Sequence, residues 1–465
     1  MSQQVVRRGG ARLGGLVRRP RPGAGWRPAL RFALVALLTA AWVGFSVWVS
    51  EPWRSDLRQA IGPVMAWVIP VTVAYIPGVV IGFLVFTLLT VRYRVPSLDP
   101  PAGPWAEGEW APVTVIVAAW NEERGIAPTL NAIARQTYRG AVEVVLADNN
   151  STDRTAEVAE RAAVRHGLTY RRVFEAEPGK HHALNTALET VATPLVVTVD
   201  ADTLLHDEAL AYLVARVAGR PQGQHTSATA GALIVENAGA NLLCRMQDWD
   251  FRLGINGVKR TQAAYNSALV AQGAFSAYWT EDVRAVGGWP DAIGEDIVLT
   301  WTLMSSRGIV QYEPCALGFT VAPEELGPFM RQRSRWARGM FETIRTVPPF
   351  RQPRVLAKFV AGIDYLVPFL DIGYIFFWIP GLILAVLGYP LIVSWVSMLV
   401  VPVTLAVYGL LRRWQERNVF RRLGVRREED VGGFWSYLFL YQALTSSASI
   451  RGYLQFITGT TRRWR

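Results

Sequence analysis

The longest apolar runs of the sequence lie near its two ends, and shorter runs fill its middle. Residues 31–50 and 65–91 are each apolar over about the length that crosses a bilayer core of ~30 Å. Pro70 and Pro77 interrupt the second run, but proline is tolerated in membrane helices. The polar residues 51–64 between the two runs are expected to form a short loop. The pattern therefore predicts a hydrophobic helical hairpin as the first element of the protein.

A second apolar region lies near the carboxyl end. Residues 365–411 are apolar except around 388–390, which predicts two spanning helices that separate at this turn. The arginine-rich residues 412–429 are expected to form a basic loop. Residues 434–450 form a weaker apolar run, which predicts either a further span or a helix in the membrane interface.

Short apolar runs alternate with amphipathic segments in the middle of the chain. Runs rich in valine and alanine predict strands buried on both faces, at residues 113–119, 142–147 and 195–199. Helical spacing of apolar residues follows each of these strands, at residues 122–136, 151–166 and 208–217. This alternation predicts an α/β domain with a parallel, doubly wound sheet. Further strands are expected at 230–235 and 269–277, and further helices at 241–259 and 297–305.

Proline-rich segments mark the expected domain boundaries. Residues 96–104 predict a linker, and residues 324–346 predict a strongly basic amphipathic helix, suited to a membrane surface, that ends before Pro348. The expected organisation is a basic tail (1–30), two membrane helices (31–95), an α/β domain (105–322), interface helices (323–360) and two or three carboxyl-terminal membrane or interface helices (361–465).

The charge of the protein is strongly basic and gathers beside the apolar runs. The net charge is +11, and nearly all of the positive charge is arginine, since lysine stands only at Lys180, Lys259 and Lys358. Arginines that flank apolar runs favour a membrane topology with the amino terminus and the segment after Arg94 in the cytoplasm. The same distribution argues against a nucleic acid partner, which needs a basic face on a soluble domain.

The first residues and the cysteines add two expectations. Residues 1–30 predict a disordered cytoplasmic tail that binds anionic headgroups. A cleaved signal peptide is the alternative, but no clear small-residue cleavage site follows Val49. Cys244 and Cys315 lie far apart and in no metal-ligand spacing, which fits a reducing cytoplasm.

Polar side chains stand where the predicted strands end. Asp200 and Asp202 follow the strand 195–199 and project to one face, because side chains alternate along a strand. Two carboxylates at such a place suit a hard divalent cation that also holds phosphate oxygens; a solvated turn is the alternative. Asn121 and Asp148 follow the other two strands, at the edge where doubly wound sheets bind their ligands.

Two junctions between strand and helix carry further candidates. Asp148 can accept hydrogen bonds from a uracil ring, whereas Ser151 and Asp153 are expected to cap the next helix. Lys180 stands at a loop–helix junction, where an ammonium group and a helix N-terminus together favour a diphosphate. An ordinary surface lysine is the alternative at this position.

A carboxylate pair at the start of a predicted helix is a candidate for base catalysis. Asp296, with Glu295 beside it, can take the proton of a sugar hydroxyl, which is a weak nucleophile. The alternative is that both acids only complement the helix dipole.

The basic helix carries the last motif. Gln332 and Trp336 stand four residues apart and share one helix face. Arg333 and Arg335 can grip phosphate oxygens, and the indole can serve as a platform for a sugar ring. A basic face on lipid, with Trp336 as an interfacial anchor, is the alternative.

Together these motifs resemble the membrane-embedded family 2 glycosyltransferases, which include cellulose, chitin and hyaluronan synthases. The resemblance covers about residues 111–345 and implies a GT-A fold with a mixed, doubly wound, Rossmann-like sheet. It implies that the UDP-sugar donor is bound by Asn121, Glu122, Asp148, Lys180, Asp200, Arg333 and Arg335. It also implies that Asp200 and Asp202 hold Mg²⁺ or Mn²⁺, and that Asp296 and Glu295 form the catalytic pair, with Asp296 as the base.

A closer resemblance, to the bacterial poly-N-acetylglucosamine synthases of biofilm matrix, rests on the segments 246–247, 255–262, 273–275, 312–314 and 323–326. It implies UDP-N-acetylglucosamine as the donor and an acceptor site shaped by Gly273, Phe275, Gln332 and Trp336. Tyr278-Trp279 and His181-His182 depart from those relatives, so the identity of the sugar stays open.

The resemblance implies an inverting hexosyltransferase in the plasma membrane of a bacterium, with its catalytic domain in the cytoplasm. It would extend an exopolysaccharide that the membrane helices guide outward, with a small membrane subunit as a possible partner. A non-processive glycolipid synthase with a lipid acceptor shares the same motifs and is the alternative. A membrane scaffold with a degenerate enzyme domain is a third interpretation, against which the intact carboxylates argue.

Overall fold

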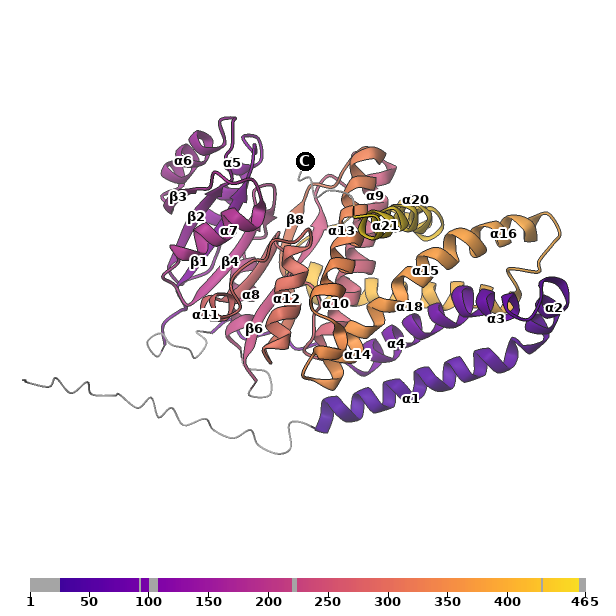
Figure 1. Cartoon of the computed structure of the whole chain (residues 1–465). Helices are drawn as coiled ribbons and strands as arrows, with labels where there is room; N and C mark the ends of the chain where they lie inside the picture. Colours follow the sequence, from indigo (N-terminus) through magenta and orange to yellow (C-terminus); the bar gives the residue numbers. More distant parts are fainter. Residues whose placement is uncertain (1–25, 92, 100–107, 220–223, 428–429, 460–465) are drawn as a thin grey trace, which may run out of the picture.

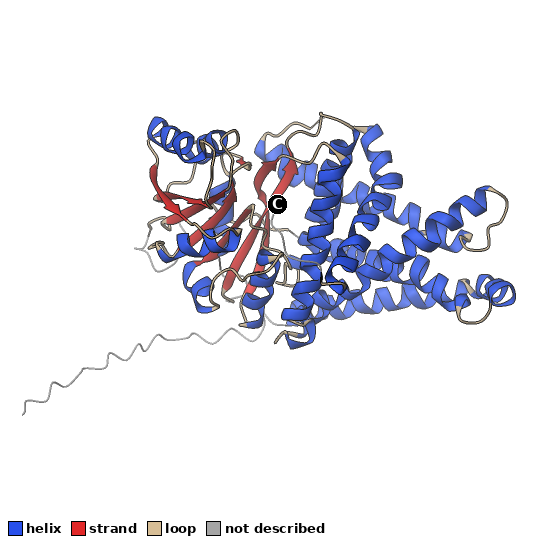
Figure 2. Ribbon diagram, turned by 45° about the horizontal axis from the view of Figure 1, so that its top comes forward, coloured by secondary structure: helices blue, strands red, loops and turns tan. Residues whose placement is uncertain are grey.

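The computed structural model describes residues 26–459 except 92, 100–107, 220–223 and 428–429. An α/β unit lies beside a layer of long helices, several of which extend well beyond the sheet (Figures 1 and 2). Most of the expected basic tail, residues 1–25, lies outside the described residues.

An eight-stranded sheet forms the core of the α/β unit, with the strand order β3-β2-β1-β4-β7-β6-β8-β5. The strands are β1 (Val113–Ala119), β2 (Val142–Asp148), β3 (Thr169–Phe174), β4 (Leu195–Asp200), β5 (Leu204–Leu205), β6 (Thr226–Val235), β7 (Phe275–Trp279) and β8 (Ile309–Thr320). The first four neighbours in this order are parallel, whereas β7 runs antiparallel to both β4 and β6. The α/β class with a mixed, doubly wound sheet is thus confirmed.

Helices cover both faces of the central strands. Val115, Ile116 and Val117 are consecutive in β1 and all fully buried, although neighbouring residues point to opposite faces. The covering helices include α5 (Ile126–Ala134), α6 (Thr155–His166), α7 (Lys180–Glu189) and α8 (Ala209–Ala218). α7 packs on β1, β2 and β3, while α8 packs on β6, β7 and β8.

Three strands differ from the sequence-based expectation. β3 is a partly exposed edge strand with two arginines, so it lacks an apolar run. β8 has 12 residues and was not predicted, because Pro314 interrupts its strand pattern. Its pairing with β6 has an irregular register between Gly231 and Ala232. The expected strand at 269–277 shortens to β7, because residues 269–274 leave the sheet and run toward the carboxylates described below.

A continuous run of helix lies between β6 and β7, as expected. It consists of α9 (Leu242–Trp249), the π-helical turn η3 (Asp250–Ile255) and α10 (Asn256–Ala263). α11 (Thr280–Ala285), α12 (Glu295–Ser305) and the long helix α13 (Leu326–Thr346) complete the surroundings of the site. α13 is amphipathic and packs along the carboxyl-terminal helix α21 (Gln442–Ile457).

Three helical runs in the described part of the chain are long and apolar enough to cross a membrane. The first run is Ala29–Val49, within α1 (Trp26–Val49). The second run is Met65–Thr90, which consists of α3 (Met65–Pro70), η1 (Val71–Tyr75) and α4 (Ile76–Thr90). The third run is Val355–Val386, which extends from α14 (Val355–Ile363) to α16 (Ile379–Val386). The first hairpin and one carboxyl-terminal span agree with the expectation. The second expected carboxyl-terminal span, in α18 (Val400–Gln415), is not among these runs.

Two segments expected to be loops are helical instead. Residues 51–64 contain the amphipathic helix α2 (Glu51–Ile61), whose buried Trp53 donates a hydrogen bond to the carbonyl of Leu391 at 2.8 Å. The basic residues 412–429 continue the helix α18 through η7 (Glu416–Phe420) and α19 (Arg421–Leu423). In both segments apolar side chains at helical spacing are buried between charged residues, which makes an amphipathic helix that a simple count of charge concealed.

The chain that leaves the first hairpin is fixed to the sheet by a buried polar network. Glu313 of β8 is fully buried and accepts hydrogen bonds from the hydroxyl of Tyr93 and from Arg216 Nε, the latter at 2.7 Å. Arg216 also donates to the carbonyl of Arg94 at 2.8 Å. The network joins the exit of the first apolar hairpin to β8 of the sheet.

Candidate active site

The parallel register of the central strands brings the first two motifs together. Ala118 of β1 pairs with Asp200 of β4, and Ala119 pairs with Asp148 of β2, so the two acids flank one strand end. Asn121 follows two residues beyond. Three of the motifs found by sequence therefore share the carboxyl edge of the sheet.

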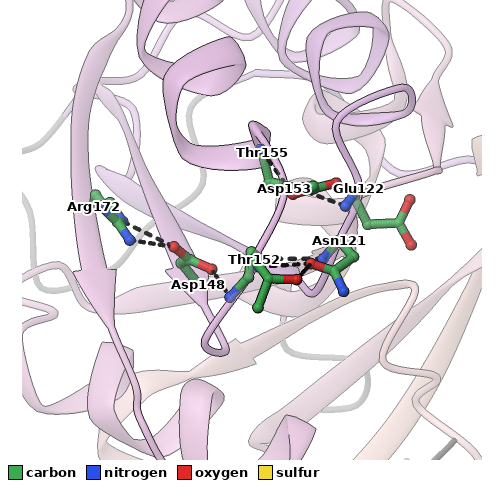
Figure 3. Close-up of polar contacts among 8 residues, drawn as sticks. Asn121, Glu122, Asp148, Thr152, Asp153, Thr155 and Arg172 are labelled. Carbon is green, nitrogen blue, oxygen red and sulfur yellow. Dashed lines mark hydrogen bonds and ion pairs between the residues drawn. The ribbon is translucent and has the colours of Figure 1, made fainter.

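Asp148 is fully buried, and both of its carboxylate oxygens have partners (Figure 3). The backbone N–H of Ser151 donates to Oδ1 at 3.0 Å, and Arg172 Nε donates to Oδ2 at 2.9 Å. Arg172 comes from the edge strand β3, which sequence reasoning did not find. A nucleobase at this edge would therefore meet an Asp148–Arg172 pair rather than a lone carboxylate.

Asn121 and Ser151 serve to tie two loops together. Asn121 adopts φ +56°, a left-handed conformation that asparagine tolerates better than most residues. Its side-chain oxygen accepts from the N–H of Thr152 at 2.8 Å, and its own N–H donates to Ser151 Oγ at 3.1 Å. Ser151 is thus not the expected helix cap, because α6 begins only at Thr155, whose N–H donates to Asp153 Oδ1 at 2.9 Å.

Glu122 joins the aspartates rather than the Asp148 turn. Figure 3 shows its carboxylate pointing away from Asp148. Burial, together with Asp202 and Asp200, raises the pKa of Glu122 to about 7, and burial and Asp200 raise the pKa of Asp202 to about 6. Such crowded negative charge is relieved by a divalent cation. The oxygen ligands fit Mg²⁺ or Mn²⁺, which take their remaining ligands from water and substrate phosphates.

A second cluster of ligand-type side chains lies elsewhere in the described residues. His225, Glu281 and Asp282 have ligand atoms within 4.8 Å of one another, beside the amino end of β6 and on α11. His225 Nε2 and Asp282 Oδ2 form a hydrogen bond of 2.6 Å. These residues lie at the opposite edge of the sheet from Asp200, since the antiparallel pairing puts Trp279 of β7 beside Leu195 of β4.

Lys180 brings a positive charge to the aspartates of the site. It opens α7 after Gly179, whose φ of +149° suits glycine, and its ammonium group forms an ion pair with Asp200. Although burial lowers its pKa, Asp200 and Glu295 raise the pKa of Lys180 above its usual range. A Cβ atom on Gly273 would stand 3.0 Å from the Lys180 nitrogen, so glycine at this position leaves room for the ammonium group.

Gly273 also connects Lys180 to the carboxylate pair of α12. Its N–H donates to Asp296 Oδ2 at 3.2 Å, while the N–H of Ile297 donates to Asp296 Oδ1 at 2.8 Å. Glu295 is buried, and burial together with Asp296 raises its pKa to about 7. The environment of Glu295 therefore favours its protonated form near neutral pH, and Asp296, held by two backbone N–H groups, is the candidate base.

Two glycines let α12 and α13 approach backbone to backbone. A Cβ atom on Gly339 would lie 3.0 Å from the Cα of Gly294, the residue before Glu295. The contact is reinforced by Glu342, which accepts a hydrogen bond from the N–H of Ile293 at 2.8 Å. Through this contact the carboxylate pair and the basic motif of α13 become neighbours, and the positive charge of Arg335 opposes the rise in the pKa of Glu295.

The residues of the α13 motif face different surroundings. Arg335 is exposed, and Trp336 is 37% exposed at the mouth of a cavity. Gln332 Oε1 is buried without a hydrogen-bond partner. Arg333, which is expected to bind the donor, is buried and lies 3.2 Å from the carboxylate of Asp250.

Phe275 also differs from the expectation. It was expected in the acceptor site, but its ring is fully buried in β7 and packs against Gly231, where a Cβ atom would approach the ring to 2.3 Å. The Gly-Ala-Phe segment thus reaches the site through Gly273, and Phe275 anchors it in the core.

Lys259 also lies at the site, although the sequence analysis gave it no role beyond its place in the shared segment 255–262. It stands on α10 with 7% of its surface exposed, and its ammonium group donates to the side-chain oxygen of Gln272. Burial lowers the pKa of Lys259 to about 7, against the attraction of Asp296. The scarcity of lysine was the available signal, because two of the three lysines lie beside the carboxylates.

Comparison with known families agrees with this arrangement. A family model described as "Glycosyltransferase like family 2" matches residues 111–339. An N-acetylglucosaminyltransferase of Mesorhizobium japonicum is 30% identical over 272 residues, which is 55% of this chain and 63% of that protein. A poly-beta-1,6-N-acetyl-D-glucosamine synthase of Staphylococcus epidermidis is 28% identical over 233 residues, 50% of this chain and 55% of that protein. The chain thus matches less than two thirds of the length of these relatives.

A solved structure shares the fold over most of the chain. The mannosyltransferase PcManGT from Pyrobaculum calidifontis, in complex with GDP-Man and Mn²⁺, matches with a TM-score of 0.55 and 21% identity. The match covers 83% of this chain and 96% of that one, so it includes helices outside the α/β unit.

Proposed function

Since the chain contains a glycosyltransferase family 2 domain at residues 111–339, we propose that it transfers N-acetylglucosamine from a UDP-sugar to a growing exopolysaccharide. The observation that carries the proposal is the series from Asp200 through Lys180 and Gly273 to Asp296. Lys180 pairs with Asp200, a Cβ atom on Gly273 would stand 3.0 Å from the Lys180 nitrogen, and the N–H of Gly273 donates to Asp296. The names of the two relatives support N-acetylglucosamine as the sugar.

The donor half of the proposed reaction lies along the carboxyl edge of the sheet. The Asp148–Arg172 pair offers hydrogen bonds of both kinds to a uracil ring, and Lys180 and Arg335 offer positive charge to a diphosphate. Asp200 and Asp202, with Glu122 beside them, would hold Mg²⁺ or Mn²⁺. When bound, the ion would neutralise charge on the departing UDP.

The acceptor half lies beside α12 and α13. Asp296 takes the proton of an acceptor hydroxyl as the oxygen attacks the anomeric carbon of the sugar. The bond from that carbon to the diphosphate oxygen breaks on the opposite face, so the configuration inverts and UDP leaves with the bonding pair. The N–H groups of Gly273 and Ile297 fix the orientation of the Asp296 carboxylate for this step.

A cavity beside the acceptor half supports export of the product. Its volume is about 570 Å³, and its lining includes Trp336 and residues of two candidate membrane spans. We take it as the entrance through which the chain would leave, with Trp336 stacked on the terminal sugar. The enzyme would act in the plasma membrane with its α/β domain in the cytoplasm, as the arginine flanks predict.

The test uses the full chain purified in detergent. Labelled UDP-GlcNAc is supplied with Mg²⁺ or Mn²⁺, and both UDP release and product size are measured. Asp296→Asn is expected to lower turnover by about 10²–10⁴-fold, the usual contribution of a general base. Asp207→Asn is the matched control, because Asp207 is an exposed acid paired only with the exposed Arg135.

Three outcomes would contradict parts of the proposal. Turnover of Asp296→Asn close to that of the wild type rejects the base. A product with a single added sugar on a lipid rejects the polymerase in favour of a glycolipid synthase. Activity with another nucleotide sugar, and none with UDP-GlcNAc, rejects the donor.

A further inference from the structure

The cavity beside Trp336 contains a buried ion pair. Its walls come from the first membrane hairpin, from η3, from α13 and from the carboxyl-terminal helices. Most lining side chains are apolar or aromatic, and the charged ones are Asp250 of η3, Arg333 of α13, Asp364 and Asp371. Of these, Asp250 and Arg333 form an ion pair, with Arg333 Nη2 3.2 Å from Asp250 Oδ2. Neither residue belongs to the donor half of the site.

Arg333 is held among rings and has unused hydrogen-bond donors. Only 6% of its surface is exposed, and the centre of its guanidinium group lies 4.2 Å from the ring centroid of Trp336 and 5.8 Å from that of Tyr441. Its Nε and Nη2 atoms are buried and donate no hydrogen bond to the described residues. Arg333 thus has the charge of Asp250 beside it but buried N–H groups whose hydrogen bonds are unmade, which is unfavourable unless a ligand supplies acceptors.

Asp250 balances the charge of Arg333. Burial raises its pKa, whereas Arg333 and a hydrogen bond of 2.9 Å from the hydroxyl of Tyr441 act in the opposite direction. The pair is therefore close to neutral as a unit, with donor groups on one side and acceptor oxygens on the other. The aromatic rings beside it offer flat apolar surfaces.

This chemistry distinguishes between the acceptors left open by the motifs. A lipid phosphate would gain from Arg333 alone, but its charge would be brought against the carboxylate of Asp250 in a poorly solvated cavity. A neutral sugar has hydroxyl groups that can donate to Asp250 and oxygens that can accept from Arg333, and its apolar face can lie on Trp336. The neutral sugar satisfies both members of the pair.

We propose that Asp250 and Arg333 select an uncharged sugar chain as the acceptor and disfavour a lipid phosphate, by binding the ring hydroxyls of that chain inside the cavity. The inference rests on the proposed function and names the acceptor class of the same site. Asp250 and Arg333 are then specificity residues, whereas Lys180 and Asp296 act on the donor and the reacting hydroxyl.

The test compares single and paired substitutions in the full chain. Asp250→Asn leaves a net positive site, Arg333→Gln leaves a net negative one, and the double variant restores neutrality while keeping amide donors and acceptors. Each enzyme receives UDP-GlcNAc with either N-acetylglucosamine oligomers or a polyprenyl phosphate as the acceptor. Arg331→Gln, at an exposed position of the same helix, is the matched control.

We expect each single variant to raise the KM for the oligomer about tenfold or more, because a hydrogen bond to a charged group is lost. The KM for UDP-GlcNAc should change much less. The double variant should recover part of the loss, and Asp250→Asn should gain transfer to the polyprenyl phosphate. A thermal unfolding transition like that of the wild type shows that each variant is folded. If a single variant does not fold, the neutral double variant still tests whether the charged pair selects the acceptor.

Two results would overturn the inference. One is an unchanged oligomer KM in folded variants of both residues, and the other is a wild-type enzyme that prefers the polyprenyl phosphate. If the wild type transfers no sugar to any acceptor, the proposed function itself has failed, which is a different result from transfer that ignores Asp250 and Arg333.

Discussion

Gly339→Ala tests whether the close approach of α12 and α13 positions the catalytic groups. The added Cβ would lie 3.0 Å from the Cα and 3.1 Å from the nitrogen of Gly294, whereas ordinary contacts are 3.4–4 Å. Both neighbours are backbone atoms, so no side chain can rotate away. The two helices must therefore separate by a few tenths of an ångström, about 0.4 Å to restore an ordinary contact of 3.4 Å.

The separation should affect turnover more than folding. Overpacking of this kind typically destabilises a protein by about 1–3 kcal/mol. A displacement of ~1 Å between catalytic groups can lower a rate by about 10²-fold, so one of about 0.4 Å should have a smaller but measurable effect. We expect kcat to fall about 3–10-fold while the protein remains folded.

The assay is UDP release by the purified enzyme, together with its thermal unfolding. Gly327→Ala is the matched control, because it lies on the same helix and its nearest neighbour, the Arg331 side chain, would be at an ordinary 3.5 Å. Equal turnover in the Gly339→Ala, Gly327→Ala and wild-type enzymes would refute the argument that this contact sets the geometry of the site.

Three further predictions concern the charges of the site. The charge of Lys259 is lost as pH rises through its pKa of about 7, so we expect turnover to fall from about pH 6 to about pH 8, and Lys259→Met should flatten this fall. A pH profile that Lys259→Met leaves unchanged contradicts a role for the Lys259 charge in turnover. Because the pKa of Glu295 is also about 7, the Glu295→Gln variant is measured to separate the two titrations. Arg172→Gln should raise the KM for UDP-GlcNAc about tenfold with little change in kcat, because it removes a charged partner of Asp148 at the proposed uracil site. An effect on kcat alone would contradict a role of Arg172 in binding the uracil. Removal of divalent ions with a chelator should abolish turnover, and Mg²⁺ or Mn²⁺ should restore it. The Asp202→Asn variant should need a higher ion concentration for the same turnover. Turnover that survives chelation would contradict the proposed dependence on a divalent ion.

The architecture followed from the sequence where apolar runs were uninterrupted. β1, β2 and β4 were predicted because their residues are apolar on both faces. β3 and β8 were not, because an edge strand needs only one apolar face and because Pro314 breaks the pattern of β8. Local periodicity does not record which strand lies at an edge.

The site was predictable only in part, for a similar reason. The acids and Lys180 stand beside recognisable strand and helix ends, so their shared location followed from topology. The partners Arg172, Asp250 and Lys259 come from elements distant in sequence, and their roles depend on burial. Arg333 shows the limit most clearly, since two arginines in one motif point to different surroundings on opposite sides of a helix.

The polar network of Glu313, Arg216 and Tyr93 bears on how the proposed polymerase would move its product. The exit of the first hairpin is attached to β8 through the fully buried carboxylate of Glu313, so rotation of the α/β unit about this connection would break its ion pair with Arg216 and leave a buried carboxylate without that partner. Advance of a polymer by one sugar would then have to arise from movements of single side chains, such as the indole of Trp336 and the other side chains that line the cavity. The frame would stay stationary while the chain slides through it.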